Sequence, residues 1–242
     1  MMRPLLRWVE AHEPLPPAHT ALREPNGLVA AGRDLSADRL LEAYRGGLFP
    51  WYSEGQPVLW WSPDPRMVLE LARFKASRSL VKTLRRIRRE GQWQISLNQR
   101  FDQVIEACSA PRPGLASGTW ITPEIRHAYG ELHRRGHAHS VEIQDEDKRL
   151  LGGLYGVSIG RMFYGESMFA WAPDASKIAL YALVDVLLAQ GFRVIDCQQN
   201  TRHLASLGAT EVPRVKFLSD VSELSVLPSP DWASVVIGFP DA

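Results

Sequence analysis

The stretch that decides the fold is LGGLYGVSIGRMFYGESMFAWAPDASKIALYALVDVLLAQGFRVIDCQ, residues 151–198. Its aromatic and β-branched residues, with glycines between them, predict two strands joined by a tight turn at Ile159-Gly160. Apolar residues on one broad face predict a helix over 176–190, which Gly191 ends. The apolar run 192–198 predicts a third, buried strand. The stretch therefore predicts a packed core of hairpin, helix and strand.

Three polar residues, Glu166, Asp196 and Gln198, interrupt these apolar strands. Burying a carboxylate without partners costs several kcal/mol, roughly. The spacing of Asp196 and Gln198 predicts that both side chains leave the same strand face. Gly165 beside Glu166 indicates a bulge or a close ligand approach. Two interpretations stay open, a reaction centre and a buried hydrogen-bonded pair that ties the strand to its neighbour.

Composition bounds the class of protein. The chain has 242 residues, of which 45% are hydrophobic and 23% charged, as in soluble globular proteins. No apolar run reaches the roughly 20 residues of a membrane span, and the N-terminus predicts no secretion signal. Two cysteines are too few for a disulfide framework and fit a reducing, cytoplasmic setting. A net charge of +1 means that a nucleic-acid partner requires a local basic patch.

Such a patch is present over residues 71–89, which hold eight Lys or Arg residues and no acid. A helix starting at Ser77 places Arg78, Lys82, Arg85 and Arg89 along one side. Like charges at this spacing destabilise an isolated helix. The run is either a solvated basic face or a surface for a polyanion such as a phosphate backbone.

Aromatic residues gather in a proline-rich segment over 49–66, with three tryptophans and four prolines, which excludes a long helix. Trp51 here, and Trp120 in the proline- and glycine-rich loop 111–120, are either stacking platforms for a base or packing at a domain seam. The turn-rich Ser62–Pro65 marks a domain boundary. Helices are predicted over 35–45 and from Pro123, which Thr122 caps. The tail 227–242 is predicted to be loosely attached.

Three histidines and one cysteine are more typical of structural residues than of a metal site or a nucleophile. His133, His137 and His139 lack a Cys, Asp or Glu at ligand spacing, so hydrogen-bonded or nucleic-acid-facing histidines are favoured over a metal site. Cys197 has no adjacent cation to stabilise a thiolate, which favours structural burial over nucleophilic catalysis.

Taken together, the chain resembles the leucyl/phenylalanyl-tRNA–protein transferases, bacterial enzymes that append Leu or Phe to an N-terminal Arg or Lys. The motifs that carry the resemblance are LREPNGLVA (22–30), GLFPWYS (47–53), LWWSPDPR (59–66), GTWIT (118–122), GHAHSVE (136–142), LGGLYGVSIG (151–160), FYGESMF (163–169) and ASK (175–177), followed by IDCQ and HLASLGA. Leu154 stands where a methionine is common and Leu183 where an aromatic residue is expected, which bears on the preference among Leu, Phe and Met.

The resemblance implies an α+β fold, with a small N-terminal domain (1–64) that contributes an aromatic wall. A GNAT-like acyltransferase domain (65–242) with a mixed, mostly antiparallel sheet follows. It implies Asp196, Gln198 and Glu166 as catalytic residues. The implied amino-acid pocket consists of Leu154, Phe163, Met168, Leu180, Leu187 and Ile195. Trp51 and Trp120 are implied to hold the terminal adenosine of the tRNA, and its stem is assigned to Arg78, Lys82, Arg85 and Arg86.

The implied reaction transfers Leu or Phe, and Met less well, from aminoacyl-tRNA to a protein or peptide with N-terminal Arg or Lys. No cofactor and no metal is implied, and the protein is expected to be a cytoplasmic monomer with no membrane partner. Two alternatives are a CoA-dependent N-acyltransferase and a non-catalytic tRNA-binding module. Against the first, WAPDASK lacks the glycines of the usual pyrophosphate loop.

Overall fold

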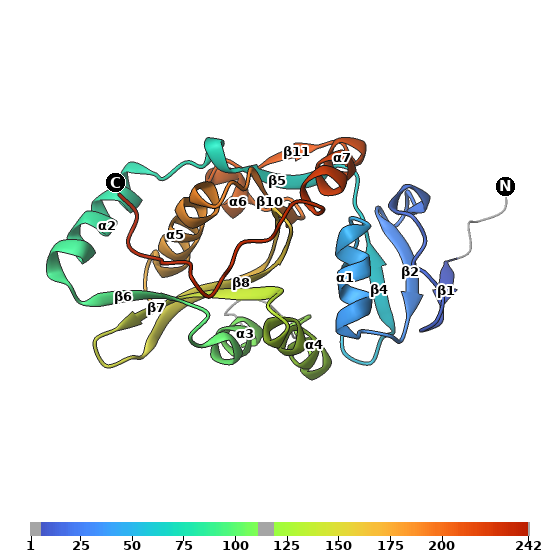
Figure 1. Ribbon diagram of the computed structural model, residues 1–242, viewed down its shortest axis with the longest axis horizontal. Coiled ribbons are helices and arrows are strands. Elements are labelled where there is room, and N and C mark those ends of the chain that lie inside the picture. The colour runs from blue at the N-terminus through green and yellow to red at the C-terminus, as the bar shows by residue number, and fades with distance from the viewer. Residues whose placement is uncertain (1–5, 111–118, 242) are drawn as a thin grey trace.

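The computed structural model describes residues 6–110 and 119–241, and it contains two β-sheets with helices packed against them (Figure 1). Most of the predicted loop 111–120 lies outside the described residues. The N-terminal part forms a four-stranded sheet in the order β1-β2-β4-β3. Its strands are β1 (Arg7–Val9), β2 (Leu28–Gly32), β3 (Phe49–Pro50) and β4 (Val58–Trp61).

The second sheet has seven strands in the order β11-β5-β10-β9-β8-β7-β6. Neighbouring strands are antiparallel except β9 and β10, which are parallel. This mixed, mostly antiparallel sheet confirms the predicted α+β class. Its strands are β5 (Arg66–Glu70), β6 (Trp93–Leu97), β7 (Ala138–Asp145), β8 (Leu150–Ile159), β9 (Met162–Ala170), β10 (Val194–Gln198) and β11 (Thr210–Val212).

Helices cover both faces of the larger sheet (Figure 1). Helix α5 (Ala175–Ala189) packs on β7, β8 and β9, with α2 (Arg78–Glu90) against it. On the other face lie α3 (Phe101–Ser109) and α4 (Pro123–Arg134), and α4 also contacts α1 (Ala37–Arg45) of the N-terminal part. The short α6 (Arg202–Ser206) and α7 (Arg214–Leu224) follow β10. The N-terminal part therefore meets the sheet on the α4 side.

Sequence signals account for the predicted helices. The Ser36, Ser77 and Thr122 hydroxyls each accept a hydrogen bond from a first-turn N–H group, so they cap α1, α2 and α4. Gly91 ends α2 in the left-handed conformation, with φ 68°. None of the described helices is both long and apolar enough to cross a membrane.

The prediction of a loosely attached C-terminal tail is wrong. Trp232 is buried and stacks on His139 of β7, with ring centroids 4.0 Å apart. Further along, Asp241 pairs with Arg88 of α2 at 2.9 Å. The tail crosses the sheet and reaches α2 (Figure 1), because the part of the sheet face that α5 leaves open needs an apolar cover.

Candidate active site

The two parallel strands of the sheet define where the site opens. In the described chain β10 pairs with β9 through Ile195–Phe163 and Asp196–Tyr164, whereas β9 continues to Ala170. Beside this short pairing lies a cavity of about 1140 Å³, lined by residues of the sheet, of α5 and α6, and of the N-terminal part. The sheet and the N-terminal part together therefore enclose it.

One side of the cavity, here called the apolar wall, consists of the residues Leu154, Phe163, Met168, Leu180 and Ile195. All five were predicted for an amino-acid pocket. Leu187, the sixth, is fully buried on α5 and is not among the lining residues, whereas Leu183, one turn earlier, is. The apolar wall offers a surface for an uncharged, hydrophobic group.

Aromatic residues form the mouth of the cavity. Trp51 and Trp120 both line it, and Trp51 keeps 42% of its surface exposed. Trp61, whose packing the sequence left open, donates its indole N–H to the Trp51 carbonyl at 2.7 Å. The rings of Trp51 and Trp61 meet edge to face at 5.8 Å. An exposed indole held in this way suits stacking against a planar ligand.

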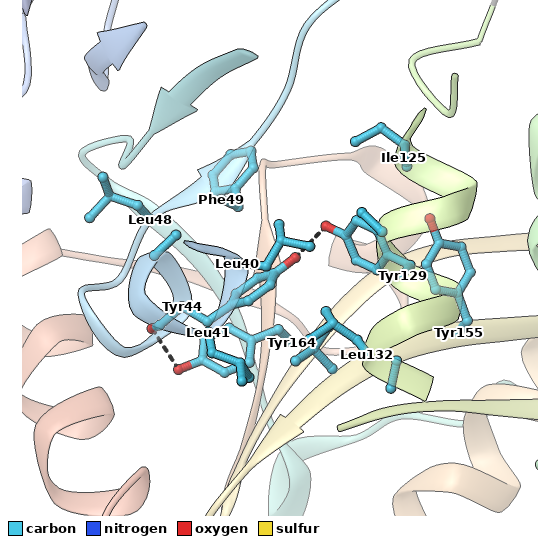
Figure 2. Close-up of a cluster of buried hydrophobic side chains, with 14 of the residues drawn as sticks. Leu40, Leu41, Tyr44, Leu48, Phe49, Ile125, Tyr129, Leu132, Tyr155 and Tyr164 are labelled. Atoms are coloured by element: carbon cyan, nitrogen blue, oxygen red, sulfur yellow. Dashed lines mark hydrogen bonds between the residues drawn. The ribbon is translucent and has the colours of Figure 1, made fainter. Parts of the chain in front are cut away.

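Two polar residues, Glu166 and Gln198, also line the cavity and are here called the polar wall. Gln198 donates from Nε2 to Oε1 of Glu166 at 2.9 Å. Behind them, Tyr44 of α1 donates to Oε1 at 2.7 Å and Tyr129 of α4 reaches Oε2 at 3.0 Å. The two tyrosine hydroxyls are 2.5 Å apart and hydrogen-bonded to each other. A dashed line marks this bond in Figure 2. No local sequence signal marks either tyrosine, since each comes from a helix that is distant in the chain.

Burial and hydrogen bonding together set the character of Glu166. Both of its oxygens accept hydrogen bonds from tyrosine hydroxyls, Oε1 from Tyr44 and Oε2 from Tyr129. Burial raises the pKa of Glu166 to about 7, although the hydrogen bonds from Tyr44, Tyr129 and Gln198 oppose the rise. The carboxyl group therefore changes charge near neutral pH.

Asp196 lies behind the polar wall and does not line the cavity. Its side chain is fully buried and accepts from Arg66, with Nε–Oδ1 at 2.8 Å and Nη2–Oδ2 at 2.6 Å. The backbone N–H of Gln198 donates to Asp196 Oδ1 at 2.9 Å. The regular alternation assumed for this strand is interrupted, because the register shifts between Asp196 and Gln198 and Gln198 has φ 61°. The spacing of residues in the sequence could not reveal this register shift, nor the pairing of Arg66 with Asp196.

The surroundings of Cys197 and of the histidines do not favour a nucleophile or a metal site. Cys197 lines the cavity, and burial raises the pKa of its thiol well above the usual value, which disfavours a thiolate nucleophile. His133 stacks on Phe101, and burial lowers the pKa of His139 to about 3. No group of three or more His, Cys, Asp or Glu residues within the described ranges could hold a metal ion.

The basic residues predicted to bind a tRNA stem all lie on α2, and the structure brings them to one exposed surface. Their side chains are solvent-exposed, whereas Leu80, Leu84 and Ile87 of the same helix are buried. The residues are Arg78, Lys82, Arg85 and Arg86. None of the four lines the cavity.

By its fold the protein is a two-part α+β molecule, whose cavity is lined by an apolar wall and by a carboxylate–amide pair. Residues 68–222 match the family model described as leucyl/phenylalanyl-tRNA protein transferase. Residues 33–64 match the model for the N-terminal domain of the same transferase.

Curated relatives cover nearly the whole chain. The leucyl/phenylalanyl-tRNA–protein transferase of Bordetella avium is 56% identical over 93% of this chain and 91% of its own. The transferase of the same name from Pseudomonas syringae is 52% identical over 95% and 99%. The chain therefore belongs to the leucyl/phenylalanyl-tRNA–protein transferase family.

Among solved structures, L-PGS from Bacillus licheniformis is similar with a TM-score of 0.36 and 12% identity, over 73% of this chain and 56% of that one. The ribosomal-protein-S5-alanine acetyltransferase of Vibrio fischeri has a TM-score of 0.27 and 14% identity, over 41% and 65%. The family assignment rests on the sequence matches.

Proposed function

We propose that this protein transfers Leu and Phe, and Met less well, from aminoacyl-tRNA to the N-terminal Arg or Lys of acceptor proteins, which tags them for degradation. Family membership supports the transfer reaction and disfavours the CoA-dependent and non-catalytic alternatives. The observation that carries the proposal is the cavity, which is lined together by the apolar wall, the hydrogen-bonded Glu166–Gln198 pair and the exposed Trp51.

Each wall has a distinct role in this proposal. The apolar wall binds the side chain of the donor amino acid, with Leu187 supporting it from the core. Ionised Glu166 holds the α-ammonium group of the donor, and Gln198 orients the attacking amine. Asp196 keeps Gln198 in place, because both of its oxygens are engaged by Arg66 and the Gln198 N–H. Of the three residues that the family resemblance implies as catalytic, Glu166 and Gln198 contact substrate, whereas Asp196 does not.

The chemistry requires little beyond positioning. The donor is an ester, already activated, so neither ATP nor a metal ion is needed for acyl transfer. The nucleophile is an α-amine with a pKa of roughly 7.7 to 8, which is partly free at neutral pH. Correct orientation of two reactants supplies about 7 to 11 kcal/mol at best. As the amide bond forms, the ester C–O bond breaks, and the amine proton passes to the ribose oxygen that leaves.

The remaining surfaces are assigned to the tRNA. We propose that Trp51 and Trp120 hold the terminal adenosine, and that Arg78, Lys82, Arg85 and Arg86 of α2 hold the acceptor stem. Exposure of these cations supports the second assignment. We propose residues 1–64 as a domain that supplies the aromatic wall, with 65–242 as the catalytic domain. One chain encloses the cavity, which supports a monomer, and the proposed charged-tRNA substrate supports a cytoplasmic location.

The test is a transfer assay with Leu-tRNA and a peptide that begins with Arg. We expect a Leu-extended peptide, a similar product with N-terminal Lys, and little product when the peptide begins with Glu or carries an acetylated N-terminus. Equal transfer to the Glu-initiated peptide would contradict the acceptor assignment. Acetyl-CoA consumption without tRNA would contradict the reaction.

A further inference from the structure

We propose that Arg66 is a positioning residue of the transfer centre, which fixes Gln198, and through it Glu166, by way of Asp196. The inference rests on the roles proposed above for Glu166 and Gln198. Arg66 lines no part of the cavity and touches no substrate group, so it acts only through its neighbours.

The first step is the fork between Arg66 and Asp196. Two parallel N–H donors of the guanidinium engage the two carboxylate oxygens, and both side chains are fully buried. A bidentate pair of this kind fixes the orientation of the carboxylate as well as its charge. Lysine offers the charge but not the planar fork. The orientation of Asp196 is therefore set by Arg66.

The second step is the restraint on Arg66 itself. Its guanidinium carbon lies 4.6 Å from the ring centre of Phe49 on β3 and 4.4 Å from that of Phe217 on α7. These rings stabilise the cation from two elements. Nη1 of Arg66 is buried without a hydrogen-bond partner among the described residues, which is costly. Apolar residues often replace a buried ion pair with no loss of stability, so stability alone does not explain this pair.

The third step leads from Asp196 to the polar wall. Gln198 has φ 61°, a left-handed conformation that a residue with a side chain seldom adopts. The hydrogen bond from its N–H to Asp196 Oδ1 holds that conformation. The same conformation carries Nε2 of Gln198 to Glu166. A rotation of Asp196 would release the Gln198 backbone, and the amide would leave its place beside Glu166.

Arg66 also lies where the two parts of the chain join. It is the first residue of β5, and the four-stranded sheet ends at Trp61. Phe49 belongs to that sheet, and Asp196 to the larger one. Through Arg66, the placement of the N-terminal part is coupled to the geometry of Gln198.

Arg66→Lys tests the inference, with kcat and KM measured separately for Leu transfer to the Arg-initiated peptide. We expect kcat to fall about 100-fold, as for a misplacement of about 1 Å at a reacting centre. KM for Leu-tRNA changes much less than kcat, since the proposed adenosine and stem contacts of the tRNA stay in place and only the contact of Glu166 with the α-ammonium group is disturbed. Arg66 acts on Gln198 only through Asp196. We therefore expect the double variant Arg66→Lys/Asp196→Asn to have the same kcat as Asp196→Asn alone.

Two variants of α7 separate positioning from stability. Phe217→Leu removes one ring from the guanidinium, whereas Val221→Ala, equally buried on the same helix, leaves it untouched. Both lower the melting temperature, but only Phe217→Leu lowers kcat of the folded enzyme. If Arg66→Lys does not fold, the comparison of Phe217→Leu with Val221→Ala still tests whether Arg66 positions the transfer centre.

A kcat within twofold of wild type in folded Arg66→Lys overturns the inference, as does equal kcat in Phe217→Leu and Val221→Ala. Losses that multiply in the Arg66→Lys/Asp196→Asn double variant also overturn it. A different result would show that the roles proposed for Glu166 and Gln198 are wrong. In that case Gln198→Ala and Glu166→Ala transfer Leu as fast as the wild type, whatever the kcat of Arg66→Lys.

Discussion

The polar wall and the apolar wall face one cavity but are built in opposite ways. The apolar wall comes from neighbouring strands and α5, and most of its members follow one another closely in the sequence. The polar wall is held by hydroxyl groups from α1 and α4 and by the buried Arg66–Asp196 pair. In the function proposed for this site, selection of the donor side chain and the transfer step are therefore separate, and we expect substitutions in each wall to have different consequences.

Glu166→Gln should give the largest effect. Loss of the charge removes a charge-assisted hydrogen bond to the donor ammonium, worth about 1.5 to 3 kcal/mol, so kcat/KM falls roughly 10- to 150-fold. Glu142→Gln is the matched control, since Glu142 is a fully buried carboxylate of β7 outside the cavity lining. It should transfer Leu at the wild-type rate. Equal loss in both variants would falsify the role of Glu166.

Trp51→Ala comes next. A base stacked on an indole contributes about 1 to 3 kcal/mol, so KM for Leu-tRNA rises roughly 5- to 150-fold with a smaller change in kcat. Trp8→Ala is the control, because Trp8 is exposed to 44% and Trp51 to 42%, and Trp8 lies on β1, away from the cavity. If both variants bind tRNA equally well, Trp51 is no platform for the adenosine.

The pH profile should show Glu166 directly. Its pKa of about 7 means that the carboxyl group is protonated below that pH and no longer holds an ammonium ion. Below this value we expect Glu166 to contribute a fall in kcat/KM of about tenfold per pH unit, in addition to the fall that the acceptor amine causes. In Glu166→Gln that limb should disappear and leave the titration of the acceptor amine. A limb near pH 7 that persists in Glu166→Gln would assign it to another group.

Single charges on α2 should give the smallest effects. Lys82→Gln removes one phosphate contact, so the slope of log affinity against log salt should decrease by about 0.7 to 0.9. Arg193→Gln removes an exposed cation that pairs with Glu223 and should leave the slope unchanged. Titrations of tRNA binding at several salt concentrations measure both. Identical slopes in wild type and Lys82→Gln would remove Lys82 from the interface.

Local signals in the sequence predicted the elements of the fold well. Periodicity and helix-end signals placed α2, α4 and α5, and aromatic, β-branched and apolar residues placed β8 to β10, because these signals act within a few residues. They also identified Glu166 and Gln198 as polar residues in an apolar setting. Contacts between distant residues could not be read in the same way. Arg66 meets Asp196 across 130 positions and Tyr44 meets Glu166 across 122.

Two errors share a physical cause. The tail was predicted to be loose because its pattern shows no periodicity, yet Trp232 finds an open sheet face. The shift in register after Asp196 was missed because a bulge is fixed by the partner strand rather than by the bulged residues. In both cases tertiary packing decides what the local sequence leaves open.

The decisive experiment is competition between Leu-, Phe- and Met-tRNA for one Arg-initiated peptide. It tests whether the apolar wall selects the donor side chain while the polar wall serves the transfer step. Leu154→Ala enlarges the space beside the apolar wall and should raise the Phe-to-Leu product ratio about tenfold. Such a change lies within the discrimination of about 1 to 3 kcal/mol that a difference of one methylene group provides. Val157→Ala, buried on the same strand but outside the cavity, should leave the ratio unchanged. Glu166→Gln should lower all three products and preserve their ratios. A changed ratio in Glu166→Gln, or an unchanged one in Leu154→Ala, would contradict the account.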